Sequence, residues 1–172
     1  VRRRVMEVYP RLRPEQVVTV LNSIDTRRFG GQAEAEEHPG VPVIGYAGRL
    51  VPEKGVEVLI RAAGRLKREG FAFRLRLAGV GTDAYRRKLE ELVQEEEIVP
   101  ETEFLGFIKA MGRFIDGLDI AVLPSVVSEA GSLMLLEYMA AGRAVVASNN
   151  GSQGEVVDDG INGLLVPPGD AE

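Results

Sequence analysis

From Pro42 onward, short apolar runs alternate with helix-forming segments, and this alternation limits the fold more than any other feature of the chain. The predicted strands are the runs at 43–48, 73–78, 102–106, 119–124, 144–148 and 163–166. The predicted helices lie between them, at 54–69, 82–97, 110–117, 131–141 and 152–157. Strands that alternate with helices are typical of parallel βαβ units. We therefore predict an α/β fold, with a parallel sheet of about six strands and helices on both faces.

The order of the strands decides where a ligand can bind. In Rossmann-like sheets a common order is 3-2-1-4-5-6, which places the first strand beside the fourth. Ligands then bind in the crevice at the carboxyl ends of those two strands. The loop after the first strand covers 49–54, and the loop after the fourth covers 124–132. We predict that these two loops meet and form the site.

Residues 1–40 lack this regular pattern, and we interpret them as a linker and the start of the domain that occupies 41–172. The basic start, with arginines at 2, 3, 4, 11 and 13, is either a solvated helix or a strip that binds a partner. Residues 17–21 are a predicted short strand, 22–25 a predicted turn, and 30–41 a predicted linker or exposed loop. His38, the only histidine, lies in that loop and is not assigned as a catalytic base.

Composition excludes several classes of protein. The 172 residues are 45% hydrophobic and 27% charged, enough for one medium-sized domain with a real core. The net charge of −5 argues against a general nucleic-acid or membrane-surface binder. Without cysteine there is no disulfide or thiolate metal site. No run approaches the ~20 apolar residues of a membrane span, no signal peptide is visible, and no cluster has metal-ligand spacing. The chain starts at Val1 and is expected to be a piece of a longer polypeptide.

Two cations and several glycines surround the first two strand-to-helix connections. Arg49 follows Gly48, and Lys54 precedes a helix, where free N–H groups and the dipole favour an anion. A phosphate would explain both cations, although two exposed basic side chains on a loop are the plain alternative. Gly79 and Gly81 follow the second strand and form either a phosphate loop or a tight turn.

The apolar segment 128–142 carries two carboxylates. Glu129 precedes the small residues Gly131 and Ser132, and with Leu133 these begin a helix whose N–H groups suit a phosphate or sugar oxygen. This helix is apolar enough to be predicted as buried. Glu137 lies eight residues after Glu129, or ~12 Å if every step is helical. It either binds ligand or is paired with a nearby arginine or backbone group.

Taken together, the motifs resemble the group 1 retaining glycosyltransferases, the nucleotide-sugar enzymes related to glycogen and sucrose synthases that have the GT-B fold. The resemblance covers about residues 17–172 and follows the order of the family's motifs: Gly48-Arg49, Lys54-Gly55, Gly79 with Gly81, Phe104-Leu-Gly106, Leu123-Pro-Ser125, Glu129 with Glu137 and Met139-Ala-Ala-Gly142, Val145-Val-Ala-Ser148, Glu155-Val-Val and Asn162-Gly-Leu-Leu-Val-Pro-Pro-Gly-Asp170. It implies that this chain is the C-terminal, donor-binding half of such an enzyme, without the N-terminal acceptor domain.

The resemblance implies a role for each site residue. Arg49, Lys54 and Glu129 are the implied catalytic residues: the two cations neutralise the donor diphosphate and leaving group, and Glu129 contacts the transferred sugar. Glu137 would bind the ribose hydroxyls. The other implied donor-binding residues are Gly48, Gly79, Gly81, Phe107, Ile108, Gly131, Ser132 and Leu133, with the backbone at 107 and 108 contacting the base. The family transfers sugar with retention of configuration and requires neither a metal nor another cofactor.

The implied function is therefore hexosyl transfer from a UDP-, GDP- or ADP-linked sugar to an acceptor sugar, lipid or small molecule held by the absent domain. The isolated chain is expected to be inactive. The expected location is the cytoplasm, at the inner face of the membrane if the whole protein associates with it. Two alternatives stay open: a nucleotide-sugar epimerase of the same fold, and a non-catalytic binding module.

The chain departs from the family's usual pattern at four places, and these concern mainly the shape of the sugar pocket. Gly131-Ser132 stands in place of Phe-Gly, and Ser23 in place of Gly in the Asn22–Asp25 motif. Ser152 follows Gly151 where a second Gly is usual, and Ala144 replaces a frequent Pro. Because serine still offers a main-chain N–H, the expected phosphate contacts are retained.

Overall fold

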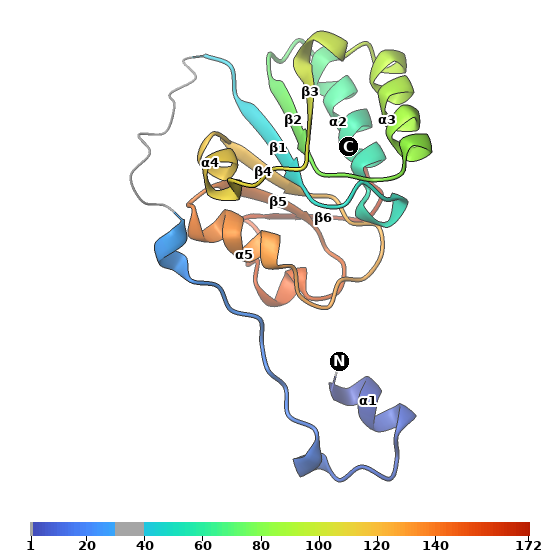
Figure 1. The fold of residues 1–172 in the computed structure, drawn as a ribbon, viewed down its shortest axis with the longest axis vertical. Coiled ribbons are helices and arrows are strands. Elements are labelled where there is room, and N and C mark those ends of the chain that lie inside the picture. Colours follow the sequence, from blue (N-terminus) through green and yellow to red (C-terminus); the bar gives the residue numbers. More distant parts are fainter. Residues whose placement is uncertain (1, 30–39) are drawn as a thin grey trace.

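The computed structural model describes residues 2–29 and 40–172, which form a six-stranded sheet with helices on both faces (Figure 1). The strand order is β3-β2-β1-β4-β5-β6, and every neighbouring pair is parallel. The strands are β1 Val43–Ala47, β2 Arg74–Ala78, β3 Thr102–Gly106, β4 Ile120–Leu123, β5 Ala144–Ser148 and β6 Leu164–Val166. The predicted α/β class and strand order are both confirmed.

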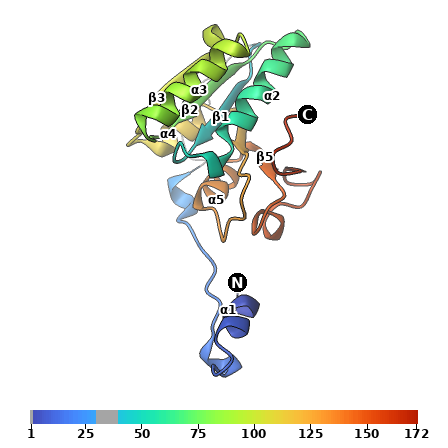
Figure 2. The same cartoon turned by 90° about the vertical axis from the view of Figure 1, so that its right-hand side faces the viewer.

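Two helices cover each face of the sheet (Figure 2). On one face α2 (Val56–Arg68) and α3 (Asp83–Glu95) pack on a core that includes Tyr46 and Leu75. On the other face, α4 (Met111–Asp116) and α5 (Leu133–Ala140) pack on a core that includes Ala121 and Val145. The connection after β5 is a 3-10 helix, Gln153–Glu155, inside the predicted helix 152–157.

The helical spacing of the sequence accounts for these packed faces. Val56, Leu59, Ile60 and Ala63 of α2 are buried, as their shared helix face predicts. All five residues of β1 are buried, which is typical of a central parallel strand covered on both faces. Thr82 caps α3, because its side chain accepts a hydrogen bond from the Tyr85 N–H.

The prediction that the apolar helix at 131–141 is buried is wrong in part. Only Leu135 and Tyr138 of α5 are fully buried, whereas Leu133 is 50% exposed. The helix also begins at Leu133, so the stretch from Glu129 to Ser132 is not helical and the ~12 Å estimate of the carboxylate separation does not apply. The reason is that α5 packs on the sheet with one face only, the face of Leu135 and Tyr138.

The N-terminal residues extend away from the sheet (Figures 1 and 2). Helix α1 (Arg2–Val8) contains no buried residue, in agreement with a solvated helix. The predicted strand at 17–21 is wrong for this structure, because the segment has no strand partner among the described residues. Val18 is 77% and Val20 87% exposed there. A β-strand requires a neighbouring strand to pair with its backbone N–H and C=O groups. The edge strands of the sheet are β3 and β6, and segment 17–21 pairs with neither.

The loop at 30–41 and the absence of a membrane span were also predicted from the sequence. His38 and most of the predicted loop at 30–41 lie outside the described residues. Within the described residues, no helix has both the length and the apolar character needed to cross a membrane.

Candidate functional site

The loops after β1 and β4 meet, as the predicted strand order requires. The Val126 N–H donates to the Glu53 carbonyl at 3.0 Å, which joins the two loops through their backbones. Gly55 begins α2 with a φ of 66°, and a Cβ atom there would overlap the carbonyl oxygen of Pro124. Glycine is therefore required at this position both by its backbone conformation and by the closeness of the loops.

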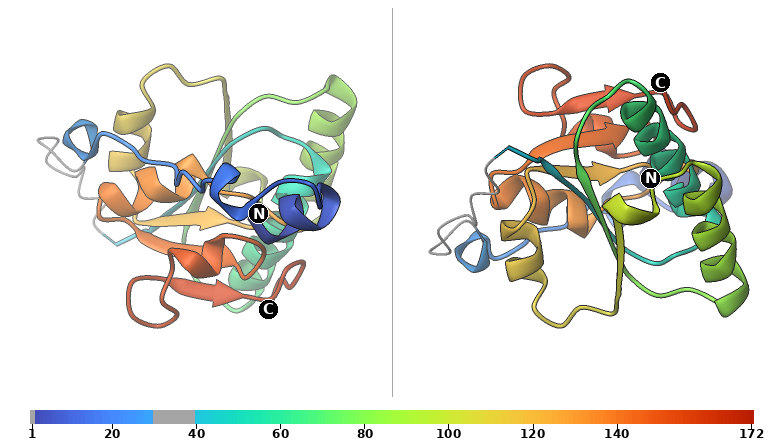
Figure 3. Two further views of the ribbon diagram at one scale, coloured as in Figure 1. Left: turned by 90° about the horizontal axis from the view of Figure 1, so that it is seen from below. Right: turned by 90° about the horizontal axis from the view of Figure 1, so that it is seen from above.

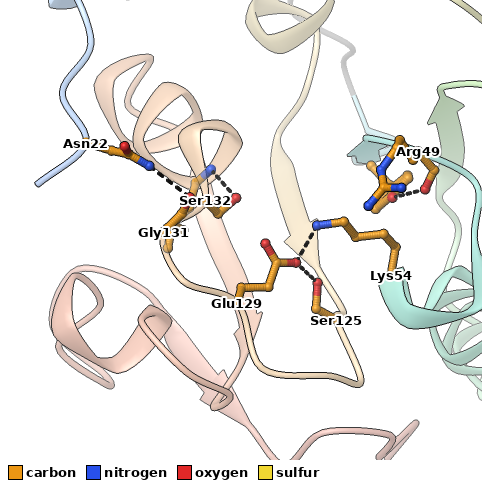
Figure 4. A network of polar contacts seen from close by, with 9 residues as sticks. Asn22, Arg49, Lys54, Ser125, Glu129, Gly131 and Ser132 are labelled. Atoms are coloured by element: carbon orange, nitrogen blue, oxygen red, sulfur yellow. Dashed lines mark hydrogen bonds and ion pairs between the residues drawn. The ribbon is translucent and has the colours of Figure 1, made fainter. Parts of the chain in front are cut away.

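The centre of the site is a carboxylate held by two donors, one from each loop (Figure 4). Lys54 Nζ donates to Glu129 Oε1 at 2.7 Å, and Ser125 Oγ donates to the same oxygen. The side chains of Lys54 and Glu129 are only 23% and 12% exposed. An ion pair so shielded is stronger than a surface pair, because less solvent screens it. Both donors contact Oε1, so Oε2 has no part in these two contacts.

A third loop fixes the backbone of Glu129. The Ser152 N–H donates to the Glu129 carbonyl at 2.9 Å, and Glu129 forms an isolated parallel bridge with Gly151. Gly151 has a φ of 75°, and a Cβ there would overlap that carbonyl oxygen. The site carboxylate is therefore held at its backbone by the loop after β5 and at its tip by the loops after β1 and β4.

The start of α5 provides N–H groups beside Glu129. Ser132 caps the helix, because its Oγ accepts from the Leu135 N–H at 3.3 Å. The N–H groups before Leu135, including that of Leu133, have no carbonyl four residues back within the helix. With the helix dipole they make this end suitable for an anion. The structure thus brings Gly131, Ser132 and Leu133 close to Glu129 and Lys54, as predicted from the sequence.

Arg49 lies beside this centre but faces solvent. It is exposed, while its carbonyl accepts a hydrogen bond from the buried Tyr46 hydroxyl at 2.8 Å. Burial raises the pKa of Tyr46 well above its ordinary range, with Tyr138 and Glu129 adding to the effect, so this hydroxyl stays a donor. The loop is held by its backbone, and the guanidinium is left available for a ligand.

The glycines after β1 and β2 have a structural explanation. The Leu50 N–H donates to the Val80 carbonyl at 2.8 Å, and Leu50 bridges to Gly81. A Cβ at Gly79 would overlap the Gly48 carbonyl, and one at Gly81 would overlap that of Leu50. Gly48 itself lies against the Tyr46 hydroxyl. Gly79 and Gly81 are therefore needed for close backbone packing, and Gly48 for the approach of the Tyr46 side chain, whether or not a ligand is present. The contact of all three glycines with the donor stays a prediction.

The remaining predicted residues, Glu137, Phe107 and Ile108, differ in how deeply they are buried. Glu137 on α5 is partly buried, which raises its pKa, while the nearby Arg28 acts in the opposite direction. Phe107 is 72% exposed just after β3, whereas Ile108 packs against the core of the α4–α5 face. Glu137 is therefore not the deeply buried carboxylate that an all-buried helix would have required.

Sequence reasoning missed two residues that hold the site. Ser125 was recognised only as part of a motif, yet it is fully buried and bonds to Glu129. A small polar residue at the end of a buried strand, four residues before a carboxylate, was the available signal. Asn22 was predicted as a turn residue and as part of the Asn22–Asp25 motif, and its bond to Gly131 spans 109 positions, so no local pattern could reveal that contact. No group of three or more potential metal ligands occurs within 2–29 and 40–172.

Comparison with known proteins identifies the family. The family model described as glycosyl transferases group 1 matches residues 41–172. The chain belongs to this family. Within the group 1 glycosyltransferases, D-inositol 3-phosphate glycosyltransferase of Saccharomonospora viridis is 35% identical over 177 residues, which cover 92% of this chain and 40% of that protein. The chain thus spans well under half the length of such relatives.

Solved structures of other proteins have the same fold as this group 1 glycosyltransferase chain. The C-terminal domain of the group 1 protein LpcC from Francisella tularensis matches with a TM-score of 0.74 and 27% identity, over 87% of this chain and 82% of that one. Anabaena HepE, solved with UDP-glucose, matches with a TM-score of 0.85 and 24% identity, over 95% of this chain and 47% of that one. At that identity the likeness to HepE concerns the fold alone.

Proposed function

We propose that this chain is the donor-binding half of a retaining glycosyltransferase that transfers a hexose from a nucleoside diphosphate. The observation that carries the proposal is the Lys54–Glu129 pair at the junction of the β1 and β4 loops. A cation, a hydrogen-bonding carboxylate and a helix start meet there at the sheet edge where ligands of such folds bind. These are the groups that a diphosphate joined to a sugar would need.

Each group has a distinct part in the proposed reaction. Arg49 and Lys54 bind the diphosphate with the N–H groups at the start of α5, and they stabilise the charge that develops on the leaving group. Glu129 accepts hydrogen bonds from the sugar, and Glu137 from the ribose. The bond from the anomeric carbon to the phosphate oxygen breaks, the acceptor hydroxyl oxygen bonds to that carbon on the same face, and its proton leaves with the nucleoside diphosphate. No metal or cofactor takes part in this proposal.

The matches support this assignment at the level of the family. HepE has been solved with UDP-glucose, and the chain resembles it over most of its own length. The match to the LpcC C-terminal domain supports the view that 41–172 is one of two domains, with 1–40 as the connection. The acceptor, whether sugar, lipid or small molecule, would then be held by a preceding domain. We further propose a cytoplasmic location, with peripheral membrane contact of the whole protein.

Titration calorimetry with UDP, GDP, ADP and their sugar conjugates tests the proposal. We expect at least one to bind with a Kd below 1 mM, and Lys54→Ala to weaken binding by about tenfold or more, as loss of a charge-assisted hydrogen bond implies. Lys88→Ala is the matched control, because Lys88 pairs with Glu57 at 2.9 Å at the α2–α3 surface. If no nucleotide binds, or if Lys54→Ala and Arg49→Ala both leave binding unchanged, the proposal is wrong.

A further inference from the structure

We propose that Asn22 is a positioning residue that holds the start of α5 in place for the donor phosphates and sugar. The inference rests on the proposed function for its ligand, but its geometry can be tested without any ligand. Asn22 lies far from the rest of the site in sequence, and the sequence assigns it to a turn and to the Asn22–Asp25 motif without giving it a contact. The structure brings it to the loop that precedes Ser132 (Figure 4).

The direct contact is a side-chain hydrogen bond. Asn22 Nδ2 donates to the Gly131 carbonyl at 3.1 Å. Gly131 is the residue just before the cap of α5, and Glu129 is two residues earlier. A hydrogen bond to this carbonyl fixes the orientation of the peptide that follows, which carries the Ser132 N–H. Asn22 therefore acts on the peptide groups that we assign to ligand binding, without touching the ligand.

The backbone conformation of Gly131 and its lack of a Cβ atom both favour this contact. Gly131 has a φ of 143°, a conformation available almost only to glycine. A Cβ atom built there would lie 3.0 Å from Asn22 Nδ2. The glycine thus serves the turn into α5 and also lets the Asn22 amide approach closely. Loss of the amide would leave this turn with fewer restraints.

The segment 22–29 is also fixed at its other end, so that Asn22 is not an isolated contact. Phe29 packs against the core of the α4–α5 face, to which α5 contributes the buried Leu135 and Tyr138. Asp25 stabilises the segment between, because its side chain accepts from the Arg27 N–H at 3.2 Å. Figures 1 and 3 both place this segment beside α5. It runs along the helix that carries Ser132, Leu133 and Glu137 and is attached near both ends.

Hydrogen exchange of the whole 172-residue chain, without ligand, tests the positioning role. Asn22→Ala and the isosteric Asn22→Asp both remove the donor. We expect the hydrogen-bonded amides of the segment 132–136, those of Leu135 and Leu136, to exchange about two- to tenfold faster, as loss of one hydrogen bond implies. Asn162→Ala is the matched control, because its amide also donates to a carbonyl, that of Val156, but away from α5. Unchanged exchange at 132–136 in both Asn22 variants would refute the proposal.

A binding measurement then separates this inference from the proposed function. If a nucleotide binds the wild-type chain, we expect both Asn22 variants to weaken it about two- to tenfold with a melting temperature close to that of the wild type. Unchanged affinity would overturn the inference while leaving the donor site intact. If the wild-type chain binds no nucleotide, the proposed function fails, and exchange at 132–136 still decides whether Asn22 positions the helix start.

Discussion

At the scale of single residues, Gln153 shows a polar group buried where an apolar one would be more stable. Its side chain is fully buried, and neither its amide nitrogen nor its amide oxygen has a partner within the described residues. Such a group costs about 1–3 kcal/mol in desolvation. We therefore expect Gln153→Met, which nearly keeps the shape, to raise the free energy of unfolding by about 1–2 kcal/mol in chemical denaturation.

A matched exposed glutamine gives the control. Gln94→Met on α3 replaces a solvent-exposed amide and should change stability by no more than about 0.5 kcal/mol. If Gln153→Met instead destabilises the chain by more than about 1 kcal/mol, the amide is serving an interaction that stabilises the native state.

Glu137 provides a prediction about pH. Burial raises its pKa above the ordinary value of about 4.5, with Arg28 opposing the shift. At a pH between the unfolded and the folded pKa of Glu137, the native state binds the proton more tightly than the unfolded state does. The free energy of unfolding therefore falls as the pH rises through this range. We expect Glu137→Gln to raise the melting temperature at pH 7 by about 1–2 °C, a gain that disappears below pH 4.

The control for this charge change is Glu95→Gln, at an exposed position near the end of α3. Melting curves of both variants from below pH 4 up to pH 7 make the comparison. A loss of stability for Glu137→Gln at pH 7 would mean that the charged carboxylate is stabilised by a partner. If Glu137 binds the ribose, the same variant also weakens nucleotide affinity, so stability and binding should change in opposite directions.

At the scale of elements, the contact between the β1 and β4 loops depends on a single glycine. Gly55 and Gly160 have nearly the same φ, 66° and 72°. A Cβ at Gly55 would overlap the Pro124 carbonyl, whereas one at Gly160 would meet nothing within 4 Å. Gly160→Ala should therefore cost only the strain of a left-handed residue, about 1–2 kcal/mol. Gly55→Ala should cost more, about 3 kcal/mol or above, because the loops must also separate.

Denaturant unfolding of the two variants gives the comparison, and calorimetry gives its consequence for the site. Separation of the loops would move Lys54 away from Glu129, so Gly55→Ala should lose nucleotide affinity while Gly160→Ala keeps it. Equal destabilisation of the two would mean that the loop after β1 moves aside easily.

The same elements explain what the sequence could and could not predict. Hydrophobic spacing and turn residues located the strands. With the common Rossmann strand order assumed, the meeting of the loops that carry Lys54 and Glu129 was predictable. The exposure of Leu133 was not, because an apolar helix does not tell which of its faces is covered. The unpaired segment 17–21 failed for a related reason: local pattern favours a strand, but a strand exists only where a partner lies beside it.

At the scale of the whole molecule, the N-terminal part exposes apolar side chains that the packing of the domain does not explain. Val18 and Val20 are largely exposed, and Val8 and Tyr9 at the end of α1 are more than half exposed. Apolar side chains gathered on one segment are typical of a surface that packs against another part of a protein. Their placement before Asn22 means that any such packing would act directly on the segment that runs along α5.

This arrangement leads to a final prediction, that the 172-residue chain binds a nucleotide sugar but does not transfer the sugar. Every site group described here is assigned to the donor, and none is assigned to an acceptor hydroxyl. Transfer requires that hydroxyl to be held in a near-attack geometry, because a misplacement of about 1 Å can already cost a large factor in rate. Incubation with the donor that binds, with and without candidate acceptors, followed by product analysis measures this. We expect unchanged donor in both cases. Transfer to an added acceptor would mean that this half contains a complete active site, and an altered sugar with donor alone would favour an epimerase.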